Sequence, residues 1–111
     1  MAEIELIYTT VSNIEEAEKI AMAVVSERLA ACANILGSIK SVYYWQGKLE
    51  QATEVALLLK TQRSVVDALV ARIRQLHSYE CPAIVVIPIL GGNPEFVAWV
   101  ASETSAPDKV Y

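Results

Sequence analysis

The hydrophobic pattern of the chain predicts four β-strands. Apolar residues stand at alternate positions in residues 3–11, which is typical of a strand because successive side chains point to opposite faces. Residues 34–60 show a second β pattern that is interrupted at Gln46-Gly47, so we expect a long hairpin that turns there. A β-branched run at residues 83–90 predicts the fourth strand. Pro88 removes a hydrogen-bond donor from this run, which places the strand at an edge of the sheet.

Three helices are predicted between and after these strands. The sequence Ser12-Asn13-Ile14-Glu15 matches a capping box, in which the first and last side chains satisfy free main-chain N–H groups. Apolar residues at three- and four-residue spacing continue this helix to residues 29–31. A second capping signature at residues 64–67 begins a helix that ends near His77, and Asn93-Pro94 begins a short third helix.

The order βαββαβ, followed by a terminal helix, predicts an α+β fold. Right-handed connections turn this order into a ferredoxin-like antiparallel sheet with both main helices on one face. A chain of 111 residues is too short to divide, so we expect one domain over residues 1–111. The third strand is apolar on both faces, with Val55, Leu57 and Leu59 on one and Ala56 and Leu58 on the other. Because 54% of the residues are hydrophobic, we expect the face without helices to be covered in a homo-oligomer.

Charge and cysteine content exclude several classes of partner. The chain has 9 basic and 13 acidic residues and no basic stripe, which argues against binding to nucleic acid or to anionic lipid. Its longest uncharged stretch, residues 81–92, is shorter than the ~20 residues of a membrane span. The first residues contain two acids and do not resemble a signal peptide, so we expect a cytoplasmic protein. In that compartment Cys32 and Cys81 are expected to be reduced thiols.

Four segments of the chain resemble a known family. They are Arg28-Leu29-Ala30-Ala31-Cys32-Ala33-Asn34, Ser41-Val42-Tyr43-Tyr44-Trp45-Gln46-Gly47-Lys48, Leu59-Lys60-Thr61 and Leu76-His77-Ser78-Tyr79-Glu80-Cys81-Pro82. In this order and spacing they resemble the CutA divalent-ion tolerance proteins. The resemblance implies a ferredoxin-like subunit that assembles into a tight homotrimer, like PII-type signalling trimers, with the sheets inward. It also implies a role in tolerance to divalent metals and an association with copper.

The candidate metal ligands are His77, Glu80 and Cys81. His77 is the only histidine, and imidazole is a common ligand of copper, nickel and zinc. A mixed nitrogen, oxygen and sulfur site suits copper or zinc. Alternatively, the His77 ring caps the last carbonyl groups of its helix or interacts with the negative end of the helix dipole. The ligand positions of copper-binding relatives match Tyr8, Leu76 and His77 here, so one of three such ligands is present.

A pocket between subunits is the second candidate site. Glu54 and Lys60 share one face of a strand, and we expect them to lie around this pocket with Tyr43 and His77. In the alternative interpretation Glu54 and Lys60 are ordinary solvated or ion-paired residues. The pocket would take an unidentified small molecule, as in a PII-like sensor.

The large aromatic side chains are candidate interface residues, namely Tyr44, Trp45 and Trp99. Cys32 is expected to be buried as a small apolar residue. No sequence motif supplies a nucleophile next to a base, so we expect a protein that is not an enzyme and needs no organic cofactor. The sequence therefore predicts a homotrimer that acts in divalent metal tolerance or homeostasis through weak binding of a divalent cation such as copper. The alternative is a PII-like sensor trimer.

Overall fold

The computed structural model describes residues 3–107 and has the predicted α+β fold. Its elements in chain order are β1 (Ile4–Val11), α1 (Ile14–Ser26), β2 (Cys32–Trp45), β3 (Lys48–Gln62), the 3-10 turn η1 (Arg63–Val65), α2 (Val66–Leu76), β4 (Ile84–Ile89) and α3 (Pro94–Ser102). No helix within the described residues is both long and apolar enough to cross a membrane.

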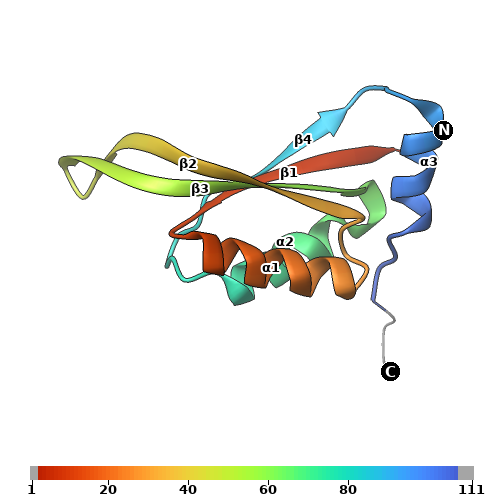
Figure 1. Ribbon diagram of the computed structural model, residues 1–111, viewed down its shortest axis with the longest axis horizontal. Coiled ribbons are helices and arrows are strands. Elements are labelled where there is room, and N and C mark those ends of the chain that lie inside the picture. The colour runs from red at the N-terminus through yellow and green to blue at the C-terminus, as the bar shows by residue number, and fades with distance from the viewer. Residues whose placement is uncertain (1–2, 108–111) are drawn as a thin grey trace.

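One antiparallel sheet of order β2-β3-β1-β4 organises the molecule. Both α1 and α2 lie on the same side of this sheet, as predicted (Figure 1). On the opposite side α3 covers only one end of the sheet, where Val97 and Val100 pack against Ile4. β4 is an edge strand, which confirms the position inferred from Pro88. β2 and β3 are longer than the helices that they cover and continue past them as a hairpin arm (Figure 1).

The hairpin arm turns at the predicted dipeptide. Trp45 pairs with Lys48, so the loop consists of Gln46 and Gly47 alone. Both loop residues have positive φ angles, 51° and 79°, which is the conformation of a two-residue turn that follows the natural twist of the strands. Glycine adopts this conformation without strain, whereas Gln46 does not.

The core lies between the sheet and the two helices. Ile7 of β1 and Leu57 and Leu59 of β3 are fully buried on the helix side of the sheet. They pack in one cluster with the apolar stripes of the helices, including Ile20, Val24, Leu69 and Ile73. Burial of a side chain of this size contributes about 1.5 to 3 kcal/mol, so this layer supplies much of the stability of the subunit.

The start of α1 differs from the prediction by one residue. Asn13, not Ser12, is the N-cap, and its side-chain oxygen accepts a hydrogen bond from the main-chain N–H of Glu16 at 2.8 Å. The Glu16 carboxylate in turn accepts bonds from the main-chain N–H and the hydroxyl of Ser12. Ser12 and Asn13 are equally good caps, and the extended backbone of Asn13 decides between them. The helix also ends earlier than predicted, at Ser26, and Arg28 follows with a positive φ.

The other two predicted caps have different outcomes. Ser64 does not cap α2; it donates a hydrogen bond to Gln62, and α2 begins from the 3-10 turn without a side-chain cap. Asn93 caps α3 as predicted, accepting a hydrogen bond from the N–H of Glu95, and Pro94 occupies the first turn.

Candidate functional site

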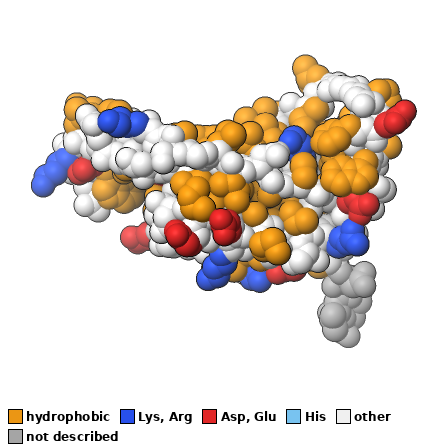
Figure 2. Space-filling view, viewed as in Figure 1, with side chains coloured by type: hydrophobic (Ala, Val, Ile, Leu, Met, Phe, Trp, Pro, Cys, Tyr) orange, Lys and Arg blue, Asp and Glu red, His pale blue; other side chains and the backbone are white. Residues whose placement is uncertain are grey.

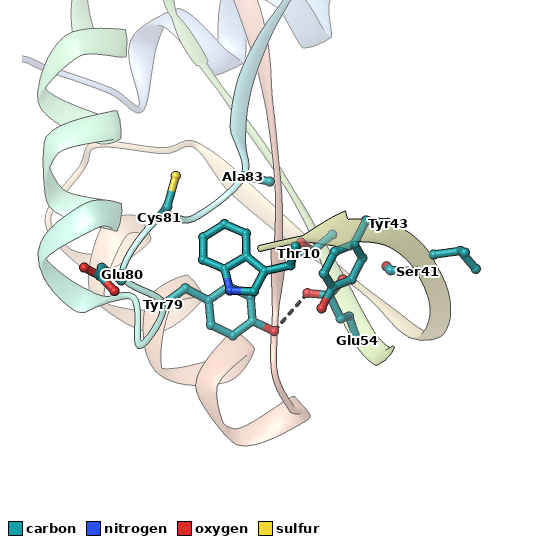
Figure 3. Close-up of a pocket in the computed structure, with 10 residues that line it drawn as sticks. Thr10, Ser41, Tyr43, Glu54, Tyr79, Glu80, Cys81 and Ala83 are labelled. Carbon is teal, nitrogen blue, oxygen red and sulfur yellow. Dashed lines mark hydrogen bonds between the residues drawn. The ribbon is translucent and has the colours of Figure 1, made fainter. Parts of the chain in front are cut away.

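A pocket of about 640 Å³ lies where the hairpin arm meets the end of β1 (Figure 3). Thr10 contributes the end of β1, and the arm contributes Tyr43, Trp45 and Glu54. The segment between α2 and β4, residues 79–83, forms the remaining wall. Segments distant in the sequence therefore meet around one cavity of the size that small-molecule sites have.

Glu54 is the buried carboxylate of this pocket. The residue is only 7% exposed, and its Oε2 atom accepts a hydrogen bond from the Tyr79 hydroxyl at 2.9 Å (Figure 3). Burial, together with this bond to Glu54, holds the pKa of Tyr79 well above its usual value of 10. The phenol therefore remains a neutral donor to Glu54 at physiological pH.

The ring of His77 supports the pocket wall from behind. Its side chain has no exposed surface, and Nε2 lies 2.8 Å from the main-chain oxygen of Thr10. Nδ1 accepts a hydrogen bond from the main-chain N–H of Tyr79 at 3.1 Å, so Nε2 carries the proton and donates to Thr10. Both ring nitrogens are thus already bonded within the protein. The ring also packs on Tyr79, with 4.7 Å between the ring centroids.

The predicted metal centre is not assembled in the described chain. No three His, Cys, Asp or Glu side chains among residues 3–107 come together to hold a metal ion. His77 offers no free nitrogen, whereas Glu80 and Cys81 are exposed at the rim of the pocket. Figure 3 shows Glu80 and Cys81 across the pocket from Glu54. The His77 ring does not cap the last carbonyl groups of α2, because it bonds to β1 instead. Its interaction with the negative end of the helix dipole stays a prediction.

Glu16 fixes the segment that carries Tyr79. Its Oε2 atom accepts a hydrogen bond from the main-chain N–H of Ser78 at 2.7 Å and lies 3.8 Å from Nδ1 of His77. Burial alone would raise the pKa of Glu16. The hydrogen bonds from Ser12 and Ser78 outweigh this effect and lower the pKa from 4.5 to about 2. The carboxylate therefore joins the start of α1 to the end of α2.

The structure brings together only part of the predicted ligand pocket. Tyr43 and Glu54 line it, but Lys60 does not. Lys60 donates a hydrogen bond to Asn34 at 2.7 Å, and its ammonium lies 5.9 Å from the centre of the Phe96 ring. Strand alternation places Glu54 and Lys60 on the same face, but six residues of strand separate them by about 20 Å.

The candidates drawn from the sequence omit Tyr79, which lines the pocket, and Glu16, which holds the segment that carries Tyr79. They also omit the lining residues Thr10, Ser41, Val42 and Ala83. Tyr79 stands in the segment that resembles the CutA proteins, between two candidate metal ligands, and this position was a usable signal. Glu16 gave only the signal of an acidic residue in the first turn of a helix, which favours capping and not a contact with residue 78.

The side of the sheet away from α1 and α2 is apolar where α3 does not cover it, and this uncovered part is here called the helix-free face. β-Pairing places Leu6 opposite Ile87 and Tyr8 opposite both Val85 and Leu58 on this face. Val85 is 48% exposed and Ile87 is 44% exposed. Figure 2 shows hydrophobic side chains along this side of the molecule. An apolar surface of this kind is typical of an interface between subunits.

The predicted interface residues are all large and exposed. Tyr44 is 74% exposed, Trp45 is 50% exposed and Trp99 is 41% exposed. Trp45, which was predicted only as an interface residue, also lines the observed pocket. Their place in an interface stays a prediction. Cys32, which we expected to be buried, is half-buried, and both cysteines are free thiols.

Comparison with known proteins assigns the chain to a family. The sequence-family model described as CutA1 divalent ion tolerance protein matches residues 5–103. The chain is 42% identical over 100 residues to the divalent-cation tolerance protein CutA of Thermus thermophilus, covering 90% of this chain and 97% of that protein. It is 39% identical over 99 residues to the chloroplastic protein CutA 1 of rice, covering 89% of this chain and 56% of that protein.

A solved structure agrees with these matches. The crystal structure of CutA1 from Oryza sativa superposes with a TM-score of 0.91 at 38% identity, covering 94% of this chain and 95% of that chain. The chain spans little more than half the length of the rice relative and nearly all of the bacterial one. On the family match and these identities, the chain belongs to the CutA1 divalent ion tolerance family.

Proposed function

We propose that this protein acts in tolerance to divalent cations and does so as a homotrimer that is not an enzyme. The observation that carries the proposal is the match to the divalent ion tolerance family over residues 5–103. The family description names tolerance and not a reaction. A cytoplasmic location is part of the proposal, although relatives in other compartments are known by name, such as the chloroplastic protein of rice.

The helix-free face supports the assembly. Leu36, Val85 and Ile87 are each more than 40% exposed on it. Leaving such a surface in water costs roughly 25 cal/mol for each Å². A closed ring of three chains would cover this face on every subunit and leave the helices outside.

The rim of the pocket supports a weak contact with cations. Glu80 and Cys81 are adjacent, exposed and free of hydrogen-bond partners among the described side chains. A carboxylate and a thiolate are ligands for copper(II) and zinc(II). Because two protein donors leave the other coordination positions to water, we expect weak binding, and we assign no ligand role to His77.

A growth assay tests the proposed function. In a bacterium that lacks its own CutA protein, expression of this chain should restore growth at a toxic copper concentration. The double substitution Glu80→Gln with Cys81→Ser should reduce this rescue, whereas Cys32→Ser, which changes the other thiol, should not. Equal growth with and without the wild-type chain would contradict the proposal.

A second candidate function is favoured by the pocket itself. A cavity of about 640 Å³ with aromatic walls is far larger than a bare ion requires and falls in the range of small-molecule sites. We therefore keep the interpretation of a PII-like sensor trimer, in which a small molecule in this pocket sets the state of the assembly.

A further inference from the structure

We propose that the pocket binds a small organic ammonium compound and that the Glu54 carboxylate is its counter-ion. This inference rests on the sensor function proposed above and names the chemical class of its ligand. It does not depend on the contact of metal ions with the rim.

The lack of an ion-pair partner for Glu54 is the first argument. Glu54 is 7% exposed, yet no ion pair with a Lys, Arg or His residue involves it among residues 3–107. Its Oε2 atom receives one hydrogen bond from the neutral Tyr79 phenol. Oε1 receives none from the described residues and is not fully buried. A buried carboxylate is costly unless a cation or several hydrogen-bond donors compensate it. A cationic ligand in the adjoining cavity would supply that compensation.

The charge of the whole pocket also favours a cationic ligand. Its lining contains two carboxylates, Glu54 and Glu80, and no basic side chain. Lys60, the basic residue that the sequence predicted for this pocket, is bonded to Asn34 elsewhere on the sheet. Such a cavity attracts cations and repels phosphate or carboxylate ligands.

The aromatic walls of the pocket favour an organic cation over a metal ion. Three aromatic side chains, Tyr43, Trp45 and Tyr79, line the cavity with Glu54. Aromatic faces attract ammonium groups, above all those whose charge is spread over methyl groups. A metal ion needs several converging donor atoms, and no such group of His, Cys, Asp or Glu exists among the described residues. The cavity volume also suits a molecule of several heavy atoms.

Calorimetry on the assembled full-length protein tests this inference. The probes are choline, its uncharged isostere 3,3-dimethylbutan-1-ol, and ATP as an anion. We expect choline to bind saturably and the isostere to bind at least about tenfold more weakly, because the two differ only in the charge that the aromatic walls and Glu54 recognise. Glu54→Gln should weaken choline binding by about tenfold or more, and Glu50→Gln, on the same strand but outside the pocket, should leave it unchanged.

A second variant keeps the test valid if Glu54→Gln does not fold. Ala83 is exposed and lines the pocket, so Ala83→Leu narrows the cavity without touching Glu54 and should also weaken choline binding. Choline binding that survives both variants would overturn the site. Binding of ATP or the isostere in preference to choline would overturn the ligand class and leave the sensor function standing. If none of the three probes binds, both the ligand class and the sensor function fail.

Discussion

The ring of His77 joins the end of α2 to β1, because its Nε2 atom donates a hydrogen bond to the main-chain oxygen of Thr10 at 2.8 Å. On its other side the ring accepts a hydrogen bond from the main-chain N–H of Tyr79. Tyr79 in turn donates to Glu54 in the pocket. One buried histidine therefore sets the position of the residue that holds the carboxylate of the pocket.

The substitution His77→Ala should destabilise the fold without changing metal binding. It leaves the Thr10 oxygen and the Tyr79 N–H without partners and opens a cavity beneath the loop, which together cost about 2 to 4 kcal/mol. Urea unfolding measures this loss, and the exposed neighbour Gln75→Ala should change the free energy of unfolding by less than about 0.5 kcal/mol. A fully stable variant that no longer binds copper would restore His77 as a ligand.

Glu16 should make the stability of the protein depend on acid pH. Its pKa is about 2 in the folded protein and 4.5 without these contacts, so the unfolded chain binds more protons between these values. Stability from this group is full above pH 4.5 and falls as the pH drops toward 2, by roughly 1 to 3 kcal/mol. In Glu16→Gln, the free energy of unfolding measured between pH 2 and 4.5 should lose this pH-dependent part. Glu15→Gln, an exposed control in the same turn, should retain it; a wild-type curve matching that of Glu16→Gln would refute the assignment.

The Tyr79 phenol should resist ionisation at alkaline pH. Burial and the bond to Glu54 raise its pKa well above 10, so the group stays protonated in the folded protein while it would ionise in the unfolded chain. Its contribution to stability is complete below pH 10 and is lost as the pH rises beyond that value. In absorbance titrations up to pH 11, Tyr79→Phe should match the wild type, because the Tyr79 phenol does not ionise in the folded protein over this range. A missing phenolate step in Tyr79→Phe would show that the phenol is accessible.

The helix-free face should control assembly. Ile87→Glu places a charge in the proposed interface, and Trp45→Ala removes a large aromatic anchor, which typically costs several kcal/mol in an interface. Sedimentation equilibrium should show a trimer for the wild type, monomers for Ile87→Glu and a weakened trimer for Trp45→Ala. Met22→Glu, at a 71% exposed apolar position on α1, should remain trimeric. A wild-type chain that stays monomeric at high concentration would leave the apolar face without its proposed partner.

Local sequence patterns predicted most of the fold. They did not predict the contacts between residues that are distant in the sequence. Pro88 marked the edge strand and Gln46-Gly47 marked the turn, because each effect acts on the backbone at that position. The hydrogen bond of His77 joins residues 67 apart in the sequence, and no spacing rule reports such a contact. Lys60 is a different case, because its separation of about 20 Å from Glu54 follows from strand spacing, and only the position of the pocket beside Glu54 depends on contacts between distant segments.

The metal-binding behaviour of the rim is the most direct test of the proposed function. Calorimetric titration of the purified protein with zinc(II), which cannot oxidise a thiol, and then with copper(II) should give weak, saturable binding. The double substitution Glu80→Gln with Cys81→Ser should abolish this binding, and Cys32→Ser should preserve it. The account is contradicted if the wild type binds neither ion, or if the double variant binds them as tightly as the wild type.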